Sequence, residues 1–136
     1  MSRPTPSATE LPSAATGPAL SARLVRAIAA QDPAGLRALF STPVTFRAVT
    51  PRRFWDAQTP QEVVDIVLGT WFGPDTTITE IRAVDTDLVG DVAKVSYRLA
   101  VDLESGPSVV EQVAYYSEQD GAITQLRLVC SGFRPL

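Results

Sequence analysis

The residues best suited to chemistry are one carboxylate and two tyrosines in the C-terminal third of the chain. Glu111 interrupts a row of apolar residues that occupy every second position. Burial in an apolar pocket raises the pKa of a carboxylate, which can then act as a general base or acid near neutral pH. The hydroxyls of Tyr97 and Tyr115 could donate to a substrate oxygen. The alternatives are a Glu111 that pairs with an arginine such as Arg47 or is exposed at a strand end, and tyrosines that only pack across strands.

The composition of the chain narrows this chemistry. None of the 136 residues is histidine, and Cys130 is the single cysteine. Histidine-based catalysis and an internal disulfide are therefore excluded, and a zinc site is not expected because zinc prefers cysteine and histidine ligands. We expect no metal and no other cofactor. Cys130 is interpreted as a small buried hydrophobe, because no histidine or lysine neighbours it in sequence to activate its thiol.

Charge and hydropathy limit the partners. The net charge of −3 argues against a nucleic-acid partner, because such binding depends on basic surfaces. No run of about 18 apolar residues is present, so we expect no membrane association through a spanning helix. A single cysteine fits a reducing compartment, and we expect a cytoplasmic protein. The preference for arginine over lysine, with many alanines, valines and prolines, is typical of GC-rich bacterial genomes.

Three predicted strands must position the candidate residues. Apolar and polar residues alternate through 92–104, and two further strand-like runs follow at 109–118 and 122–130. Ser105-Gly106-Pro107 and Asp120-Gly121 separate these runs and are typical turn sequences. The three runs are therefore predicted to form an antiparallel meander with one apolar face.

The turns favour one register for this meander. In that register Glu111 lies opposite Val101 on one side and Cys130 on the other, and Tyr115 lies opposite Tyr97. A slip of one residue would move Glu111 to the outer face, because successive side chains point to opposite faces. Four residues along a strand span roughly 13 Å, so Glu111 and Tyr115 could act only at opposite ends of one ligand.

The first half of the chain is predicted to contribute helices. Residues 1–19 are rich in proline, serine, threonine and alanine and are expected to form a disordered tail, which leaves 20–136 as a single domain. Apolar spacing predicts a helix over 20–31, and Asp32-Pro33 is typical of the start of a second, short one that Thr42-Pro43 ends.

A strand over 44–49 follows these helices, with Phe46 on its apolar side. After Thr50-Pro51 we expect a short helical piece that holds Trp55. Thr59-Pro60, with Glu62 three residues after the threonine, forms a capping box for a helix over 60–72. A further strand over 77–87 precedes the meander.

The order of helix, helix, strand, helix and four strands favours an α+β fold. We expect a cone-shaped roll in which a strongly twisted antiparallel sheet wraps around the N-terminal helices. The interior is predicted to hold a pocket that Glu111 and the tyrosines share with Phe46, Trp55, Trp71, Val101, Val113, Leu128 and Cys130. Trp71 has core packing as its alternative role.

With these elements the chain resembles the nuclear transport factor 2-like superfamily, which includes SnoaL-like cyclases and ketosteroid isomerase. The resemblance covers about residues 20–134, and the chain is similar to uncharacterised bacterial members of the superfamily. It rests on the helix pair SARLVRAIAAQDPAGLRALF and on the meander that ends DGAITQLRLVCSGFRP. It implies a pocket for a small apolar organic ligand and a homodimer through the outer sheet face, where we expect Arg98, Gln112, Tyr116 and Arg127.

The resemblance does not select an activity. The histidine of the superfamily's dehydratases has no counterpart in this sequence. The Arg–Asp arrangement of its epoxide hydrolases could correspond only to Arg98 and Asp102, both expected on the outer face. Two functions remain open: a cofactor-independent isomerase, lyase or hydrolase that uses Glu111, and a non-catalytic dimeric module that binds a ligand or a protein. A cavity of about 300 Å³ or more beside an unpaired Glu111 would favour the first; a Glu–Arg pair would favour the second.

Overall fold

The computed structural model describes the backbone from residue 12 to residue 136 and the side chains from residue 19 onward. The first helix, α1, covers Pro12–Ala29 and so begins before residue 20, the predicted start. Residues 12–19, which we expected in the tail, therefore belong to this helix. The rest of the predicted tail, residues 1–11, lies outside the described residues.

Three further helical segments follow, and the starts of the first two agree with the sequence signals. They are α2 (Pro33–Arg37), α3 (Pro60–Val64) and the π-helix η1 (Asp65–Trp71). The Asp32 side chain accepts a hydrogen bond from the Gly35 N–H at the start of α2. At the start of α3, Thr59 and Glu62 form the predicted capping box, in which each side chain bonds to the other residue's backbone N–H. The helix predicted over 60–72 is present, but most of its second half has π rather than α geometry.

The strands form one sheet of seven members, in the spatial order β2-β1-β6-β5-β4-β3, with the short β7 paired to β5. Their bounds are β1 Phe40–Thr50, β2 Arg53–Ala57, β3 Thr77–Val89, β4 Val92–Leu103, β5 Gly106–Gln119, β6 Ala122–Cys130 and β7 Arg134–Pro135. The helical piece expected around Trp55 is wrong, because this segment is β2. Thr42-Pro43, expected to end a helix, lies inside β1. The sheet is mixed rather than wholly antiparallel, because β1 runs parallel to β6.

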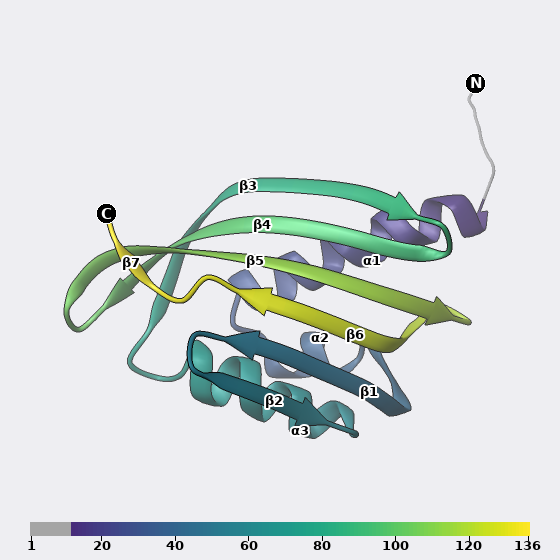
Figure 1. Ribbon diagram of the computed structural model, residues 1–136, viewed down its shortest axis with the longest axis horizontal. Helices are drawn as coiled ribbons and strands as arrows, with labels where there is room; N and C mark the ends of the chain where they lie inside the picture. The colour runs from purple at the N-terminus through teal and green to yellow at the C-terminus, as the bar shows by residue number, and fades with distance from the viewer. Residues whose placement is uncertain (1–11) are drawn as a thin grey trace.

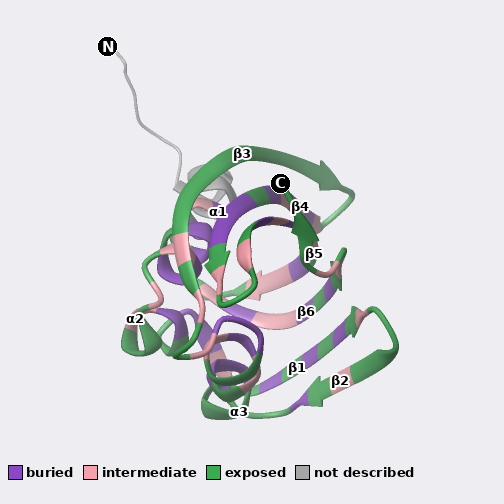
Figure 2. Ribbon diagram, turned by 90° about the vertical axis from the view of Figure 1, so that its left-hand side faces the viewer, coloured by how far each residue is buried: buried purple, intermediate pink, exposed green. Residues whose placement is uncertain are grey.

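The sheet curls around the helices, which confirms the predicted α+β roll. Figure 1 shows the sheet in front, with α1 and α2 behind it and α3 beside β2. Figure 2 shows the curl, with buried segments facing the helices and with β3 exposed along most of its length. The core between sheet and helices includes Leu24, Ile28, Phe46, Leu99 and Leu126. The predicted inward face of β4 is also confirmed: Val95, Tyr97, Leu99 and Val101 are all buried.

The register predicted for the β4–β5 hairpin is wrong. Leu103 pairs with Gly106, so the turn consists of Glu104 and Ser105 instead of Ser105-Gly106-Pro107. Gly106 has a φ of +124°, a conformation that glycine adopts at little cost. The resulting shift is odd, so every side chain of β5 lies on the face opposite to the one expected.

The new register changes which residues meet across the hairpin. Glu111 lies opposite Arg98 rather than Val101, and Tyr97 lies opposite Gln112 rather than Tyr115. On the other side of β5, the predicted pairing of Gln119 with Ala122 is present. A bulge between Ser117 and Glu118 then shifts the pairing by one. The inward residues of β5 are consequently Ser108, Val110, Gln112, Ala114 and Tyr116, all buried.

Candidate functional site

Glu111 lies on the outer surface and is held by two arginines. Its Oε2 is 2.9 Å from Arg98 Nη2, and its Oε1 is 2.7 Å from Arg134 Nη2. Hydrogen bonding to Arg98, followed by the charges of both arginines, lowers the pKa of Glu111 below its ordinary value. The prediction of an interior Glu111 is therefore wrong. The predicted alternative, a pair with an arginine, is present with different partners, since Arg47 pairs with Asp56 at 3.5 Å.

The two candidate tyrosines lie on opposite faces of the sheet, so their predicted juxtaposition is wrong. Tyr97 is buried, and its O–H donates to Gln112 Oε1 over 2.7 Å. Burial raises the pKa of Tyr97, because the phenolate would have to lose its hydration. Tyr115 is exposed on the outer face, where it lies opposite Lys94 and Arg127.

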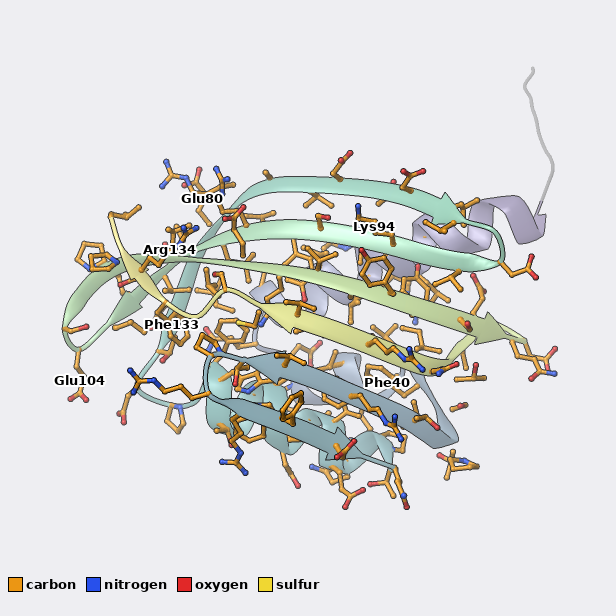
Figure 3. The ribbon with its side chains drawn as sticks, viewed as in Figure 1. Phe40, Glu80, Lys94, Glu104, Phe133 and Arg134 are labelled. Atoms are coloured by element: carbon orange, nitrogen blue, oxygen red, sulfur yellow. The ribbon has the colours of Figure 1, made fainter. Side chains whose placement is uncertain are left out.

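An open cavity of about 480 Å³ lies where the interior meets the surface, beside the inward-facing Gln112. It is lined by Thr50, Pro51, Arg52, Trp71, Phe72, Gln112, Cys130, Ser131, Gly132 and Phe133. Figure 3 labels Phe133 and Arg134 on the C-terminal segment that contributes one wall. The rings of Phe72 and Phe133 meet edge to face with centroids 5.9 Å apart. Three aromatic side chains therefore give the cavity a mainly apolar wall.

The end of the π-helix places Trp71 and Phe72 in this wall. The Phe72 N–H donates to the Val67 carbonyl over 2.9 Å, as the π geometry requires. Gln31, which follows α1, then fixes the chain beyond the helix. Its Nε2 donates to the carbonyls of Phe72 and Thr76, at 3.1 and 2.9 Å. The Ile78 N–H donates to Gln31 Oε1 over 3.0 Å, so one side chain joins the helix end to the start of β3.

The opposite rim is formed by the β1–β2 turn and the residues after β6. Gly132 has a φ of +77°, and a Cβ at this position would lie 2.8 Å from Pro51 Cγ. The close approach of these two segments therefore requires a glycine. Arg52, at the tip of the turn, has a φ of +75°, which is uncommon for a residue with a side chain. Such strained positions persist only where the surrounding structure holds them, and they cluster at ligand-binding sites.

Several polar groups of the cavity form a short network, and the Trp71 Nε1–H lies outside it without a partner. The Gln112 amide accepts from Tyr97 through Oε1 and donates through Nε2 to Cys130 Sγ over 3.3 Å. The Gly132 N–H donates to the same sulfur over 3.5 Å. The Trp71 side chain is buried, and its Nε1–H has no hydrogen-bond partner. A buried donor without an acceptor is costly in a folded protein and calls for an explanation.

The residues predicted to line an interior pocket are dispersed among four environments. Trp71 and Cys130 line the cavity. Phe46, Val101 and Leu128 are buried in the core. Val113 shares the outer face with Glu111 because it has the same parity along β5. Trp55 is half-buried on β2, with its ring edge-on to Trp71 at 5.9 Å and the Arg53 guanidinium stacked on it at 3.7 Å.

Of the residues that line the cavity, only Trp71 and Cys130 were among the predicted site, and those that were missed include Gln112, Arg52 and Phe133. Gln112 occupies the alternate set of β5 positions beside Glu111, and the apolar pattern of β5 does not distinguish the two sets. Arg52 and Phe133 lie in segments without regular periodicity, and nothing in the sequence indicates that they share a cavity.

The outer face carries a separate groove of about 600 Å³ across β2, β1, β6 and β5. Its exposed apolar residues are Val49, Phe54 and Val129. Of the four residues expected at a dimer interface on this face, Arg98 and Arg127 are exposed. The other two are misplaced: Gln112 is buried in the interior, and so is Tyr116, whose hydroxyl bonds to Ser21 Oγ over 2.7 Å.

No group of three or more potential metal ligands is found among the described residues. Within the same part of the chain, no helix is long and apolar enough to cross a membrane.

Solved structures show which fold this is. A Bacillus subtilis protein provisionally named an isomerase matches with a TM-score of 0.74 at 9% identity, over 89% of this chain and 90% of its own. A nuclear transport factor 2-like protein of unknown function from Mesorhizobium loti matches with a TM-score of 0.65 at 19% identity, over 90% and 96%. A Catenulispora acidiphila protein with a ketosteroid isomerase-like fold, in complex with trimethylamine, matches with a TM-score of 0.64 at 16% identity, over 84% and 86%.

No family model and no curated protein sequence matches the chain. The structural matches agree with the resemblance noted in the sequence, and the chain has the nuclear transport factor 2-like fold.

Proposed function

We propose that the chain binds a small, mainly apolar organic molecule in the cavity beside Gln112 and does not transform it. The observation that carries this proposal is the Trp71 indole, whose buried N–H lacks an acceptor in the wall of an open, aromatic-lined cavity. The Nε1 atom is covered, so a ligand with a carbonyl or similar oxygen would supply that acceptor after a small shift of the indole ring. The volume of about 480 Å³ suits a small organic molecule.

The geometry supports binding better than catalysis. No carboxylate is among the described residues that line the cavity. The predicted base, Glu111, is on the outer face, and its lowered pKa keeps it ionised and paired. The hydroxyl of Tyr97 is already donated to Gln112, and its raised pKa makes it a poor acid at neutral pH. A general base within reach of a bound substrate is thus missing from the described cavity.

The same fold supports the proposal by analogy, because the Catenulispora acidiphila neighbour is in complex with trimethylamine. The identity of 16% limits this analogy to the fold and to its capacity to bind small molecules.

A matched pair of probes tests the binding proposal. Acetophenone and ethylbenzene have similar size, but only the ketone has a hydrogen-bond acceptor. At roughly 0.5 kcal/mol per non-hydrogen atom, a fragment of this size should bind with a Kd on the order of 1 mM. This range is suited to titration followed by ¹H–¹⁵N correlation spectra, in which the two indole N–H groups give separate peaks that Trp71→Phe assigns.

We expect acetophenone to move the Trp71 indole N–H downfield while the Trp55 peak moves less, because the Trp55 Nε1–H already donates to Thr50 Oγ1 over 2.8 Å. Ethylbenzene should shift the surrounding amides without that downfield change. If neither probe disturbs the resonances of Trp71, Phe72 and Gln112 at millimolar concentration, the cavity is not a binding site for molecules of this kind.

We also propose that the outer sheet face joins two copies of the chain. Val49, Phe54 and Val129 lie side by side on β1, β2 and β6, with exposed fractions of 41%, 80% and 54%. The next row along these strands carries the opposite charges of Arg47 and Asp56. An apolar row flanked by both signs of charge suits a two-fold contact, in which each patch meets its own copy.

Sedimentation equilibrium at micromolar concentration tests this association. We expect a dimer for the wild-type chain and a monomer for Phe54→Glu, which places a charge in the apolar row. Leu88→Glu is the matched control, because Leu88 is also well exposed, at 65%, but lies on the distant edge strand β3. A wild-type chain that sediments as a monomer would refute the proposal.

A further inference from the structure

We propose that the ligand of the cavity is an organic carboxylate: an aromatic or aliphatic body with one anionic group that Arg52 binds at the rim. This inference rests on the proposed binding function and adds the charge of the ligand. It follows from the hydrogen-bond inventory of the cavity wall, from its charge, and from the conformation of the turn that carries Arg52.

The side-chain acceptors of the wall already have donors. Thr50 Oγ1 accepts from Trp55 Nε1–H, and Ser131 Oγ accepts from the Glu111 N–H over 2.9 Å. Gln112 Oε1 accepts from Tyr97. The hydroxyl protons are also used, because Ser131 Oγ donates to the Gly132 carbonyl and Thr50 Oγ1 contacts the Arg53 carbonyl.

Donors, in contrast, are left over. The Trp71 Nε1–H has no partner. Gln112 carries two amide hydrogens, and the bond to Cys130 Sγ engages one of them with a weak acceptor. Arg52 brings the five N–H groups of its guanidinium. A wall with surplus donors and occupied acceptors is complementary to a ligand rich in acceptors.

The charge of the cavity wall also favours an anionic ligand, because it is positive. Arg52 is the single charged residue among the described residues that line the cavity. No described carboxylate lies within salt-bridge distance of Arg52. Glu111, whose backbone N–H donates to Ser131, has its carboxylate neutralised by Arg98 and Arg134. A bound carboxylate would therefore meet an uncompensated cation, and its bidentate geometry matches the guanidinium fork.

The backbone conformation places Arg52 at the rim. Arg52 adopts its left-handed conformation in the two-residue turn between β1 and β2. Pro51, directly before it, packs against Gly132 on the facing segment. The aromatic rings of Trp71, Phe72 and Phe133 line the rest of the cavity, so an apolar body has a place to pack when its anionic group is at Arg52.

Three probes of one shape and different charge test the inference: 3-phenylpropionate, 3-phenylpropanamide and 3-phenylpropylammonium. Each is titrated into the full chain at pH 7 in low salt, and chemical shifts of the Trp71 indole N–H and of the surrounding amides give the Kd. We expect the carboxylate to bind at least about tenfold more tightly than the amide, which corresponds to about 1.4 kcal/mol. The ammonium should bind more weakly than the amide, and the preference for the carboxylate should shrink at high salt.

Arg52→Gln should remove the preference, so that carboxylate and amide bind equally. Arg52→Lys should keep part of it, because the charge remains while the fork geometry is lost. Arg23→Gln is the matched control. It makes the same change in net charge at an exposed site on α1. This site is distant from the cavity, because nearby Ser21 contacts Tyr116, which lies roughly 13 Å along β5 from Gln112. This variant should bind like the wild type.

The outcomes separate the two proposals. Equal binding of carboxylate and amide to the wild-type chain, with both perturbing Trp71, would refute the anionic ligand and leave the binding function standing. A preference that survives Arg52→Gln would show that Arg52 is not the anion site and would also refute the inference. If none of the three probes perturbs the cavity resonances, both proposals fail.

Discussion

Removal of the Tyr97 hydroxyl tests the network that organises the interior of the cavity. Tyr97 and Gln112 are 2% and 1% exposed, and 2.7 Å separates the hydroxyl from the amide oxygen. Tyr97→Phe deletes this hydrogen bond and leaves the Gln112 oxygen buried without a donor. An unmade bond of this kind costs the desolvation of the abandoned group, so we expect a loss of about 2 kcal/mol in the free energy of unfolding.

Urea unfolding followed by circular dichroism measures this loss. With an m-value of about 2 kcal/mol per molar, the midpoint should fall by about 1 M. Tyr115→Phe removes the same atom from the exposed outer face and should change the free energy of unfolding by less than about 0.5 kcal/mol. A second substitution, Gln112→Leu, should cost less in the Tyr97→Phe background than in the wild type, because it then removes the abandoned acceptor. A midpoint for Tyr97→Phe equal to that of the wild type would refute this account of the network.

Three further predictions concern charge, backbone and pH. In Glu111→Gln the urea midpoint should fall at pH 7. The lowered pKa of Glu111 makes its contribution fully present above the ordinary value of 4.5, so the difference from the wild type should shrink as the pH falls below 4.5 and through the lowered pKa. Gly132→Ala should lower the free energy of unfolding in urea by about 1–2 kcal/mol, because the left-handed φ is costly for alanine and the added Cβ would meet Pro51. Gly69→Ala is the control and should not destabilise the chain, because the space around its Cβ is open. The raised pKa of Tyr97 means that only the unfolded chain releases this proton near the ordinary value of 10.0, so this tyrosine should lower the free energy of unfolding by about 1.4 kcal/mol per pH unit above pH 10. The pKa of Tyr116 is raised as well, so equilibrium unfolding at several alkaline pH values should show a smaller slope for Tyr97→Phe than for the wild type.

The elements of this fold could largely be predicted from local signals. Asp32 and the pair Thr59 and Glu62 cap the helices that they were expected to cap, because capping depends on residues three positions apart. The alternation in β4 also predicted its buried face, since polar residues occupy nearly every other position. What failed were the features that the partner strand decides, such as β2, whose extended conformation comes from pairing with β1.

The faces of β5 could not be predicted from its own pattern. One set of positions contains Val109, Glu111, Val113 and Tyr115, and the other contains Val110, Gln112, Ala114 and Tyr116. Each set has one polar residue in an apolar series, so hydropathy does not distinguish them. The face that β5 turns inward depends on the position of the β4–β5 turn. The observed turn, Glu104-Ser105, is a weaker turn signal in the sequence than Gly106-Pro107, which follows it. In β6 a signal was available: the buried Ile123 and Leu126 are three residues apart, which breaks the period of two at the bulge.

The physical chemistry of burial explains why β5 adopts the observed parity. In the opposite parity the Glu111 carboxylate would face the interior beside Tyr97, away from Arg98 and Arg134, and an unpaired buried charge costs several kcal/mol. The observed parity buries a neutral amide instead, whose oxygen accepts from Tyr97 and whose nitrogen donates to Cys130. It also gives the carboxylate two arginines at the surface. The arrangement with the lower burial cost thus places at the cavity, instead of a carboxylate that could act as a base, an amide that can only form hydrogen bonds, and the proposed binding function rests on this exchange.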